Sequence, residues 1–247
     1  MTENQFSAEL LHYAASHNPA APSHLGTRYG KRGGFRREPG NTVVCHVASG
    51  SETERVLIDV RDDYLDMPEA DKLLLTPITS LHMTLFQGII EYRREPGFWP
   101  ADLALDTPID DMNEIMAERL VAFQALEPFS VVVTGADPAG LTVEGRGDVD
   151  RLAMRAWRDA FADLLGYRHP DHDSYVYHIT FGYPIERLSD AALPAWQSML
   201  DAVPGRIAAR VPELELTPPA FCVFEDMNHF HEILVFDTEE DMETIDD

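Results

Sequence analysis

The sequence predicts an α+β fold in which helices pack on antiparallel sheets. Apolar residues alternate with polar ones in several short segments and recur at helical spacing in three longer ones, and the two kinds of segment are interleaved along the chain. A hydrophobic share of 45% over 247 residues is sufficient for a packed core. No low-complexity linker divides the chain, so we expect a single domain over residues 1–247. A mobile N-terminal segment of about residues 1–22 and a solvated acidic tail at 237–247 are expected at its ends.

The strands are indicated by short apolar runs, rich in β-branched and aromatic residues. They are expected at 42–47, 55–60, 81–90, 129–134, 140–144, 175–181, 213–217, 220–225 and 230–236. The two cysteines, Cys45 and Cys222, lie within two of these runs and are expected to be buried free thiols.

Three segments have the apolar spacing of amphipathic helices. The first is expected at Asp110–Gln124, where acidic residues occupy the first turn. The second is expected from Asp148 to Leu165, and Gly166 is expected to end it because glycine readily adopts a left-handed conformation. The third is expected from about Ser189 to Arg210.

The charge of the chain restricts its partners. There are 43 acidic and 19 basic side chains, so the formal net charge is −24. Such a surface repels a long phosphate backbone, and we expect no long nucleic acid as a partner. No run approaches the roughly 20 apolar residues of a spanning helix, and the N-terminus lacks the features of a signal peptide. We therefore expect a cytoplasmic protein without a membrane partner.

One segment, LGTRYGKRGGFRREPG, has the opposite charge. It contains five bases within ten residues, and its glycines allow the backbone to approach an anion closely. Two interpretations of this basic loop remain open. It binds a phosphate through its guanidinium groups, or it is a solvated loop whose charges balance acidic neighbours.

Two predicted strands carry the same short motif, a histidine followed two residues later by a threonine. Because side chains alternate along a strand, His82 and Thr84 share one face, and His178 and Thr180 share one face of theirs. The intervening residues are apolar in both strands. About 0.2 such patterns are expected by chance in a chain of this composition, against two observed, so the pair indicates function.

Paired strand-borne H-x-T motifs in a chain of this size resemble those of the 2H phosphoesterase superfamily, which includes cyclic phosphodiesterases and RNA ligase-like proteins. The segment LGTRYGKRGGFRREPGNTVVCHV further resembles a bacterial branch of that superfamily, DUF1868. The resemblance implies two pseudo-symmetric lobes of antiparallel sheet with outer helices, around a central groove that holds one motif from each lobe. Phe181 follows the second motif at a position where the family frequently has leucine.

The chemistry explains why such a family needs these residues. Opening a cyclic phosphodiester requires a base to deprotonate water and an acid to protonate the leaving oxygen, and two imidazoles can supply both without a metal or cofactor. Thr84 and Thr180 would donate hydrogen bonds to the nonbridging phosphate oxygens. Which histidine is the base depends on which ester bond breaks, so His82 and His178 remain open to either role.

The sequence contains two other candidate sites, both for a metal, and is compatible with two other functions. His229 and His231 share a strand face, but no third and fourth ligand at a recognisable spacing accompanies them. His169, Asp171, His172 and Asp173 cluster in a loop, where polar residues usually solvate a turn, so we expect no metal at either place. A protein that binds a nucleotide phosphate without hydrolysing it is the alternative function. A purely structural protein would keep its two motifs buried and far apart.

The preferred substrate is a small nucleotide cyclic phosphate or an RNA terminus. Arg28, Tyr29 and Arg36 of the basic loop are expected to contact it, and either Tyr29 or Phe86 to stack on its base. The segment between Glu91 and Pro108 is interpreted as a lid or a long connection.

Overall fold

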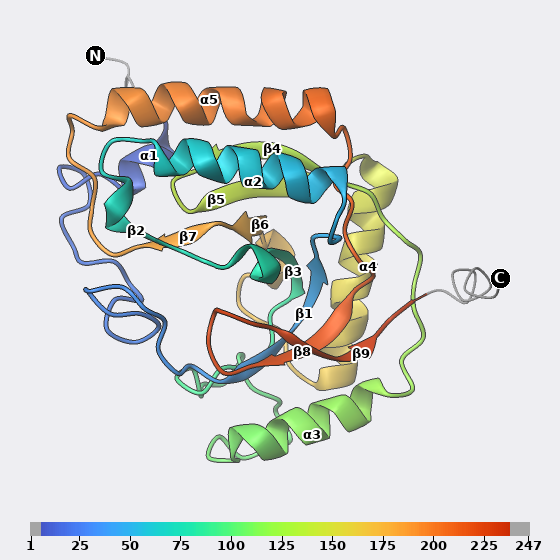
Figure 1. The fold of residues 1–247 in the computed structure, drawn as a ribbon. Coiled ribbons are helices and arrows are strands. Elements are labelled where there is room, and N and C mark those ends of the chain that lie inside the picture. The colour runs from blue at the N-terminus through green and yellow to red at the C-terminus, as the bar shows by residue number, and fades with distance from the viewer. Residues whose placement is uncertain (1–5, 238–247) are drawn as a thin grey trace.

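The fold is taken from a computed structural model, and residues 6–237 are described (Figure 1). Its strands are β1 (Gly40–His46), β2 (Leu73–Leu75), β3 (His82–Phe86), β4 (Val131–Asp137), β5 (Gly140–Gly145), β6 (Tyr177–Thr180), β7 (Gly182–Pro184), β8 (Ala220–Phe224) and β9 (His231–Val235). Seven of them form one antiparallel sheet in the order β4-β5-β6-β3-β1-β8-β9, and β2 pairs with β7.

In the described part of the chain, five helices accompany the sheet. They are α1 (Ala8–His12), α2 (Glu52–Leu65), α3 (Ile109–Leu120), α4 (Asp148–Leu165) and α5 (Leu193–Arg210). Short 3-10 turns occur at Ala70–Lys72, Ile78–Ser80 and His172–Ser174. In Figure 1, α2 and α5 run side by side at the top, whereas α4 and α3 cover the half of the molecule that contains β1 and β8.

The large sheet consists of two halves that meet at the pairing of β3 with β6. One half contains β4, β5 and β6, and the other contains β3, β1, β8 and β9. Met83 pairs with Ile179 at this junction. The fold is therefore α+β with a large antiparallel sheet, as predicted, and the two expected lobes correspond to the two halves of one sheet.

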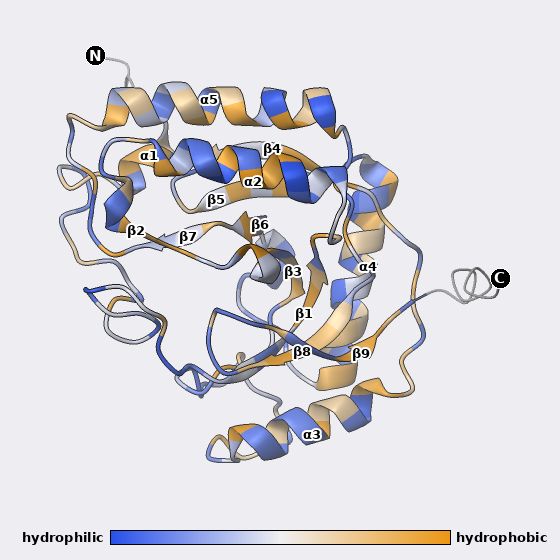
Figure 2. Cartoon of the chain, viewed as in Figure 1, coloured by the Kyte–Doolittle hydropathy of each residue, from blue (hydrophilic) through white to orange (hydrophobic). Residues whose placement is uncertain are grey.

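The core lies between the sheet and its helices. Met83 and Ile179 are fully buried there against apolar side chains of α2, α4 and α5, among them Tyr64, Phe161 and Trp196. These helices have hydrophobic residues on one side and hydrophilic residues on the other (Figure 2). A smaller apolar cluster lies around β8 and contains Val44, Ala220, Cys222, Phe224, Met227 and Phe230. Cys45 and Cys222 are buried free thiols, as predicted.

The strand predicted at 55–60 is wrong, because these residues lie within α2. Val56, Leu57, Val60 and Tyr64 recur at helical spacing and are all buried on one face. Ser51 caps the helix, since its side chain accepts a hydrogen bond from Glu54 N at 3.0 Å. A short apolar run fits a strand or a buried helix equally well, and the cap decides between them.

Other boundaries also differ. The predicted strand at 213–217 is reduced to one bridge between Val47 and Leu216, and the strand predicted at 81–90 ends at Phe86. The second long helix begins and ends as predicted, with Gly166 in the left-handed conformation. Residues 6–22, part of the segment expected to be mobile, include α1, whose Leu10 and Leu11 are buried in the core. The acidic tail from residue 238 onward lies outside the described residues.

Within residues 6–237, no helix is both long enough and apolar enough to cross a membrane.

Candidate active site

Both H-x-T motifs line one cavity of about 710 Å³. His82 and Thr84 of β3 face it, while Leu81, Met83 and Leu85 are buried in the core on the other face of the strand. His178 and Thr180 of β6 face the same cavity. Two segments 96 residues apart in sequence thus contribute matching pairs of side chains to one groove.

The register between β3 and β6 explains why the motifs meet. Met83 and Ile179 are the middle residues of the two motifs, and they lie opposite each other in an antiparallel pair. This register places His82 across from Thr180 and Thr84 across from His178. The four polar side chains are therefore arranged with approximate twofold symmetry about the Met83–Ile179 pair.

The two imidazoles are held by equivalent contacts. Nδ1 of His82 lies 2.7 Å from the carbonyl oxygen of Ser80, and Nδ1 of His178 lies 3.2 Å from that of Val176. A carbonyl oxygen can only accept a hydrogen bond, so Nδ1 of each ring donates. In the neutral ring, the lone pair then belongs to Nε2. Each histidine is oriented by the backbone two residues before it, and its Nε2 remains available for proton transfer.

The two histidines differ in their surroundings. The ring of Phe230 packs on His82 with the centroids 4.2 Å apart, and the ring of His46 on β1 lies 6.0 Å away. Burial lowers the pKa of His82 to about 3, with smaller contributions in the same direction from the nearby His46 and His178, while the hydrogen bond to Ser80 opposes the shift. His178, in contrast, is exposed in the cavity.

The threonines are supported by different neighbours. The phenol of Tyr175 interacts with the side chain of Thr84, and Tyr175 also lines the cavity. The guanidinium carbon of the buried Arg158 lies 4.2 Å from the centroid of the Tyr175 ring. On the other strand, the hydroxyl of Thr76 donates to the carbonyl oxygen of Thr180 at 3.2 Å, which fixes the backbone of the second motif.

The chain is similar to one known family and to one solved structure. The family model 2H-phosphodiest, a domain of unknown function (DUF1868), matches residues 28–142. A crystal structure of a conserved protein of unknown function from Agrobacterium tumefaciens has 46% sequence identity and a TM-score of 0.92, over 94% of this chain and 100% of that chain. The protein belongs to the DUF1868 branch of the 2H phosphoesterase superfamily. No curated protein matches the chain.

The DUF1868 match includes the basic loop and the first motif but ends before the second motif. The A. tumefaciens structure extends the likeness to nearly the whole chain, so the second motif lies within a fold shared by both proteins.

Of the basic loop in this DUF1868 protein, Arg28 reaches the cavity. Its Nε lies 2.5 Å from the carboxylate of Glu38, whose side chain is buried, and its guanidinium packs on the ring of Tyr183 at 5.4 Å. The pKa of Arg28 is raised by Tyr183 and Glu38 although burial opposes this. Glu38 thus neutralises Arg28, and Arg37 similarly pairs with Glu225 at 2.8 Å. For these two bases the loop balances acidic neighbours, which was the second interpretation of the sequence.

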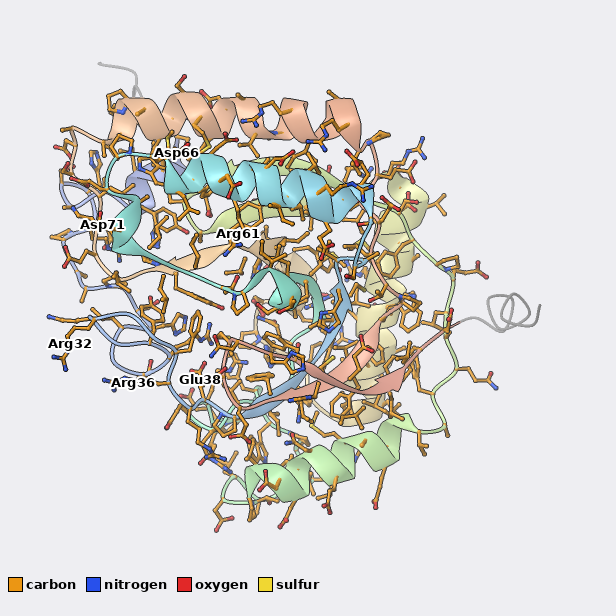
Figure 3. The ribbon with its side chains drawn as sticks, viewed as in Figure 1. Arg32, Arg36, Glu38, Arg61, Asp66 and Asp71 are labelled. Carbon is orange, nitrogen blue, oxygen red and sulfur yellow. The ribbon has the colours of Figure 1, made fainter. Side chains whose placement is uncertain are left out.

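The other predicted substrate contacts lie elsewhere. Arg36 does not line the cavity, because its guanidinium donates to the carbonyl oxygen of Gly26 at 2.7 Å and so closes the loop on itself. Figure 3 shows Arg32 projecting away from the body of the protein at the outer edge of the same loop. The stacking role predicted for Tyr29 is wrong, since its side chain is 1% exposed and its hydroxyl donates to the carbonyl oxygen of Pro184 at 2.8 Å.

The stacking role predicted for Phe86 is also wrong. Strict alternation along β3 would place Phe86 on the same face as His82 and Thr84. The pairing with β1 has a register shift between Val43 and Val44, so that Phe86 pairs with Val43 and Thr84 with Val44. Such a bulge redirects the side chains that follow it. Phe86 consequently lies in the core, with its ring centroid 5.9 Å from that of Phe161.

The segment 91–108 is a packed connection that also contributes to the cavity. Trp99 is buried, and its indole nitrogen donates to the carbonyl oxygen of Ala104 at 3.0 Å. Arg94 pairs with Glu91 at 2.6 Å. Tyr92 and Arg93 from the same segment line the cavity. Neither residue was among the substrate contacts predicted from the sequence, although the adjacent Arg93 and Arg94 in an unassigned insertion were a visible signal.

The histidines that were candidate metal ligands contact other side chains. His172 lies 2.9 Å from the carboxylate of Asp159, and His169 lies 3.0 Å from the side-chain oxygen of Gln87. The rings of His229 and His231 contact each other, with centroids 4.2 Å apart. In the part of the chain that the structure describes, no three His, Cys, Asp or Glu side chains are grouped so as to hold a metal ion.

Proposed function

We propose that this protein hydrolyses a cyclic phosphodiester of a small nucleotide or of an RNA terminus, with His82 and His178 as its base and acid. The observation that carries the proposal is the matched placement of the two imidazoles. Each donates its Nδ1 proton to a backbone carbonyl, and both rings line the same cavity. In-line opening of a cyclic phosphate needs proton transfer on both sides of phosphorus, and two oriented Nε2 atoms supply it.

The surroundings of the histidines suggest their starting roles. Burial keeps His82 neutral at pH 7, since its pKa is lowered to about 3, so its Nε2 accepts the proton of the attacking water. His178 then donates a proton to the leaving sugar oxygen. The exposed position of His178 in the cavity allows it to exchange protons with solvent between turnovers.

The threonines and the size of the cavity complete the proposal. Thr84 and Thr180 lie beside the histidines, and their hydroxyls are placed to donate hydrogen bonds to the nonbridging oxygens, on which negative charge must be stabilised. A cavity of about 710 Å³ has the volume of a small-molecule site. Together with the net charge of −24, this favours a nucleotide or a chain end over a polymer.

Steady-state kinetics on a panel of candidate substrates test this function. The panel contains nucleoside 2′,3′-cyclic phosphates, ADP-ribose cyclic phosphate and a short RNA with a cyclic end, each assayed with and without EDTA. We expect turnover of at least one substrate by the wild type, insensitive to the chelator. Loss of activity in EDTA would indicate metal catalysis instead.

The alternative function predicts a different result with the same panel of compounds. A protein that only senses a nucleotide phosphate would bind members of the panel, as measured by calorimetry, without converting any of them. That result would reject hydrolysis and leave the cavity as a binding site.

A further inference from the structure

The cavity contains a second cationic group away from the histidines. His82 pairs with His46 at one end of β1, whereas Ile90, three residues before Arg93, bridges Gly40 at the other end. These backbone positions are about 20 Å apart. The guanidinium itself hydrogen-bonds the carbonyl oxygen of Gly88, four residues after Thr84, which places it within roughly 14 Å of the first motif along the chain. Arg93, His24 and Arg28 nevertheless line the same cavity as the motifs. The groove is therefore long enough to hold one anion at the histidines and another at Arg93.

Arg93 lacks the acidic partner that its neighbours have. Arg28 pairs with Glu38 and Arg94 with Glu91, but within residues 6–237 no carboxylate forms a salt bridge with Arg93. It makes a long hydrogen bond of 3.4 Å to the carbonyl oxygen of Gly88, and the ring of Phe98 lies 4.6 Å from its guanidinium carbon. The carboxylates of Asp171 and Glu38 act on it only at longer range. Its Nε is buried without a partner.

A partly buried cation without a partner is costly unless a ligand compensates it. Among the described residues, Arg61 and Arg158 also have a buried Nε without a partner and form no salt bridge. Arg158 donates to the carbonyl oxygens of Leu85 and His172. Arg61 donates to the carbonyl oxygen of Thr76. Neither arginine lines this cavity. Arg93 differs from both because it faces the open groove with one weak polar contact.

We propose that Arg93 and His24 form an anion subsite that binds a second phosphate or diphosphate of the substrate. The proposal rests on the proposed function, because the first anion is the cyclic phosphate held between the histidines. Arg93 supplies the charge, since the guanidinium of Arg28 is already neutralised by Glu38. His24 lies within the electrostatic range of both arginines and adds a ring nitrogen as a hydrogen-bond donor. The preferred substrate is then a nucleotide that carries a phosphate at its 5′ end as well as the cyclic phosphate.

Two aromatic side chains of the cavity agree with this assignment. Tyr92 lies next to Arg93 and is 62% exposed, and Tyr183 lies beneath Arg28. Both line the cavity. They provide apolar surface for the sugar or base that must connect the two phosphates.

The test compares substrates that differ in the 5′-phosphate alone. Adenosine 2′,3′-cyclic phosphate and its 5′-phosphorylated form are assayed for kcat/KM, and adenosine 3′-monophosphate and adenosine 3′,5′-bisphosphate are compared by calorimetry. For the wild type we expect a preference of roughly tenfold or more for the 5′-phosphorylated member of each pair. In Arg93→Gln both ratios should fall close to one, and Arg93→Lys, which keeps the charge, should retain an intermediate preference.

Arg32→Gln is the matched control, because Arg32 is exposed outside the cavity and its removal changes the net charge equally. Its ratios should equal those of the wild type. An undiminished ratio in Arg93→Gln, or equal use of both substrates by the wild type, would overturn the subsite while leaving hydrolysis intact. Absence of turnover together with an Arg93-dependent preference in binding would instead reject hydrolysis and support the subsite.

Discussion

Met83 of β3 lies directly opposite Ile179 of β6, and this pair relates the two H-x-T motifs by approximate twofold symmetry. Both side chains are buried in the core, so the residues on either side of them must face the other surface of the sheet. The pair thus connects the packing of the core to the geometry of the groove. A shift of one residue in this register would turn one motif away from the cavity.

His82→Ala and His178→Ala are each expected to lower kcat by roughly 10²-fold to 10⁴-fold, with a smaller effect on KM. Because acid and base act together, the double variant should be little worse than either single variant. His231→Ala is the control, since His231 is exposed on β9 and does not line the cavity. Undiminished turnover in either single variant would reject the two-histidine mechanism.

The dependence of kcat/KM on pH is expected to reflect the half-buried His82. An unperturbed imidazole titrates near pH 6.5. Since the pKa of His82 is lowered to about 3, activity limited by protonation of this base should persist well below pH 6.5. Initial rates measured between pH 4 and 9 test this. An acid limb centred at or above pH 6.5 would show that His82 is not the base in the free enzyme.

The stability of the protein is also expected to depend on His82. Between pH 6.5 and about 3, the histidine is neutral in the folded state but protonated in the unfolded chain, so the unfolded state binds more protons. The free energy of unfolding should therefore be fully retained above pH 6.5 and fall as the pH decreases. Urea titrations at several pH values measure this free energy for the wild type and for His82→Gln. Its decrease with falling pH should be weaker in the variant. His231→Gln should follow the wild type, and identical slopes for all three proteins would contradict the prediction.

Tyr175→Phe is expected to lower kcat several-fold, because the phenol interacts with the side chain of Thr84 and so positions its hydroxyl. KM should change less. Tyr177→Phe is the matched control, since both rings lie near Arg158 but Tyr175 alone of the two lines the cavity. If both variants lose the same activity, the effect comes from packing on Arg158 and not from Thr84.

Gly140→Ala is expected to destabilise the protein by roughly 1–3 kcal/mol and to lower activity. Gly140 has φ +152°, and an added Cβ would lie 2.1 Å from the carbonyl oxygen of Ile179. Gly140 also pairs with Thr180, so relief of this clash displaces the second motif. Gly205→Ala in α5 has open space around the new methyl group and should stabilise the protein by up to about 1 kcal/mol. Thermal unfolding of the two variants would distinguish these outcomes.

The residues that the sequence placed correctly are those governed by local periodicity. The alternation around Met83 and Ile179 predicted that each His and Thr would share a face away from the core, and the structure has this arrangement. The helix from Asp148 to Leu165 was likewise predicted to the residue, because an amphipathic repeat and a terminal glycine define it. The prediction of a strand at 55–60 was wrong because a short apolar run does not distinguish a strand from a buried helix face.

The sequence by itself determined the α+β class, the pair of motifs and the face on which each histidine lies, because these follow from the spacing of side chains along one segment. The tertiary structure alone decided which distant groups meet. Glu38 neutralises Arg28, the shifted pairing of β1 with β3 turns Phe86 into the core, and the segment after Ile90 brings Arg93 into the groove. These contacts depend on strand register and on the path of loops, which are set by packing between segments far apart in the sequence and leave no periodic signal within any one of them.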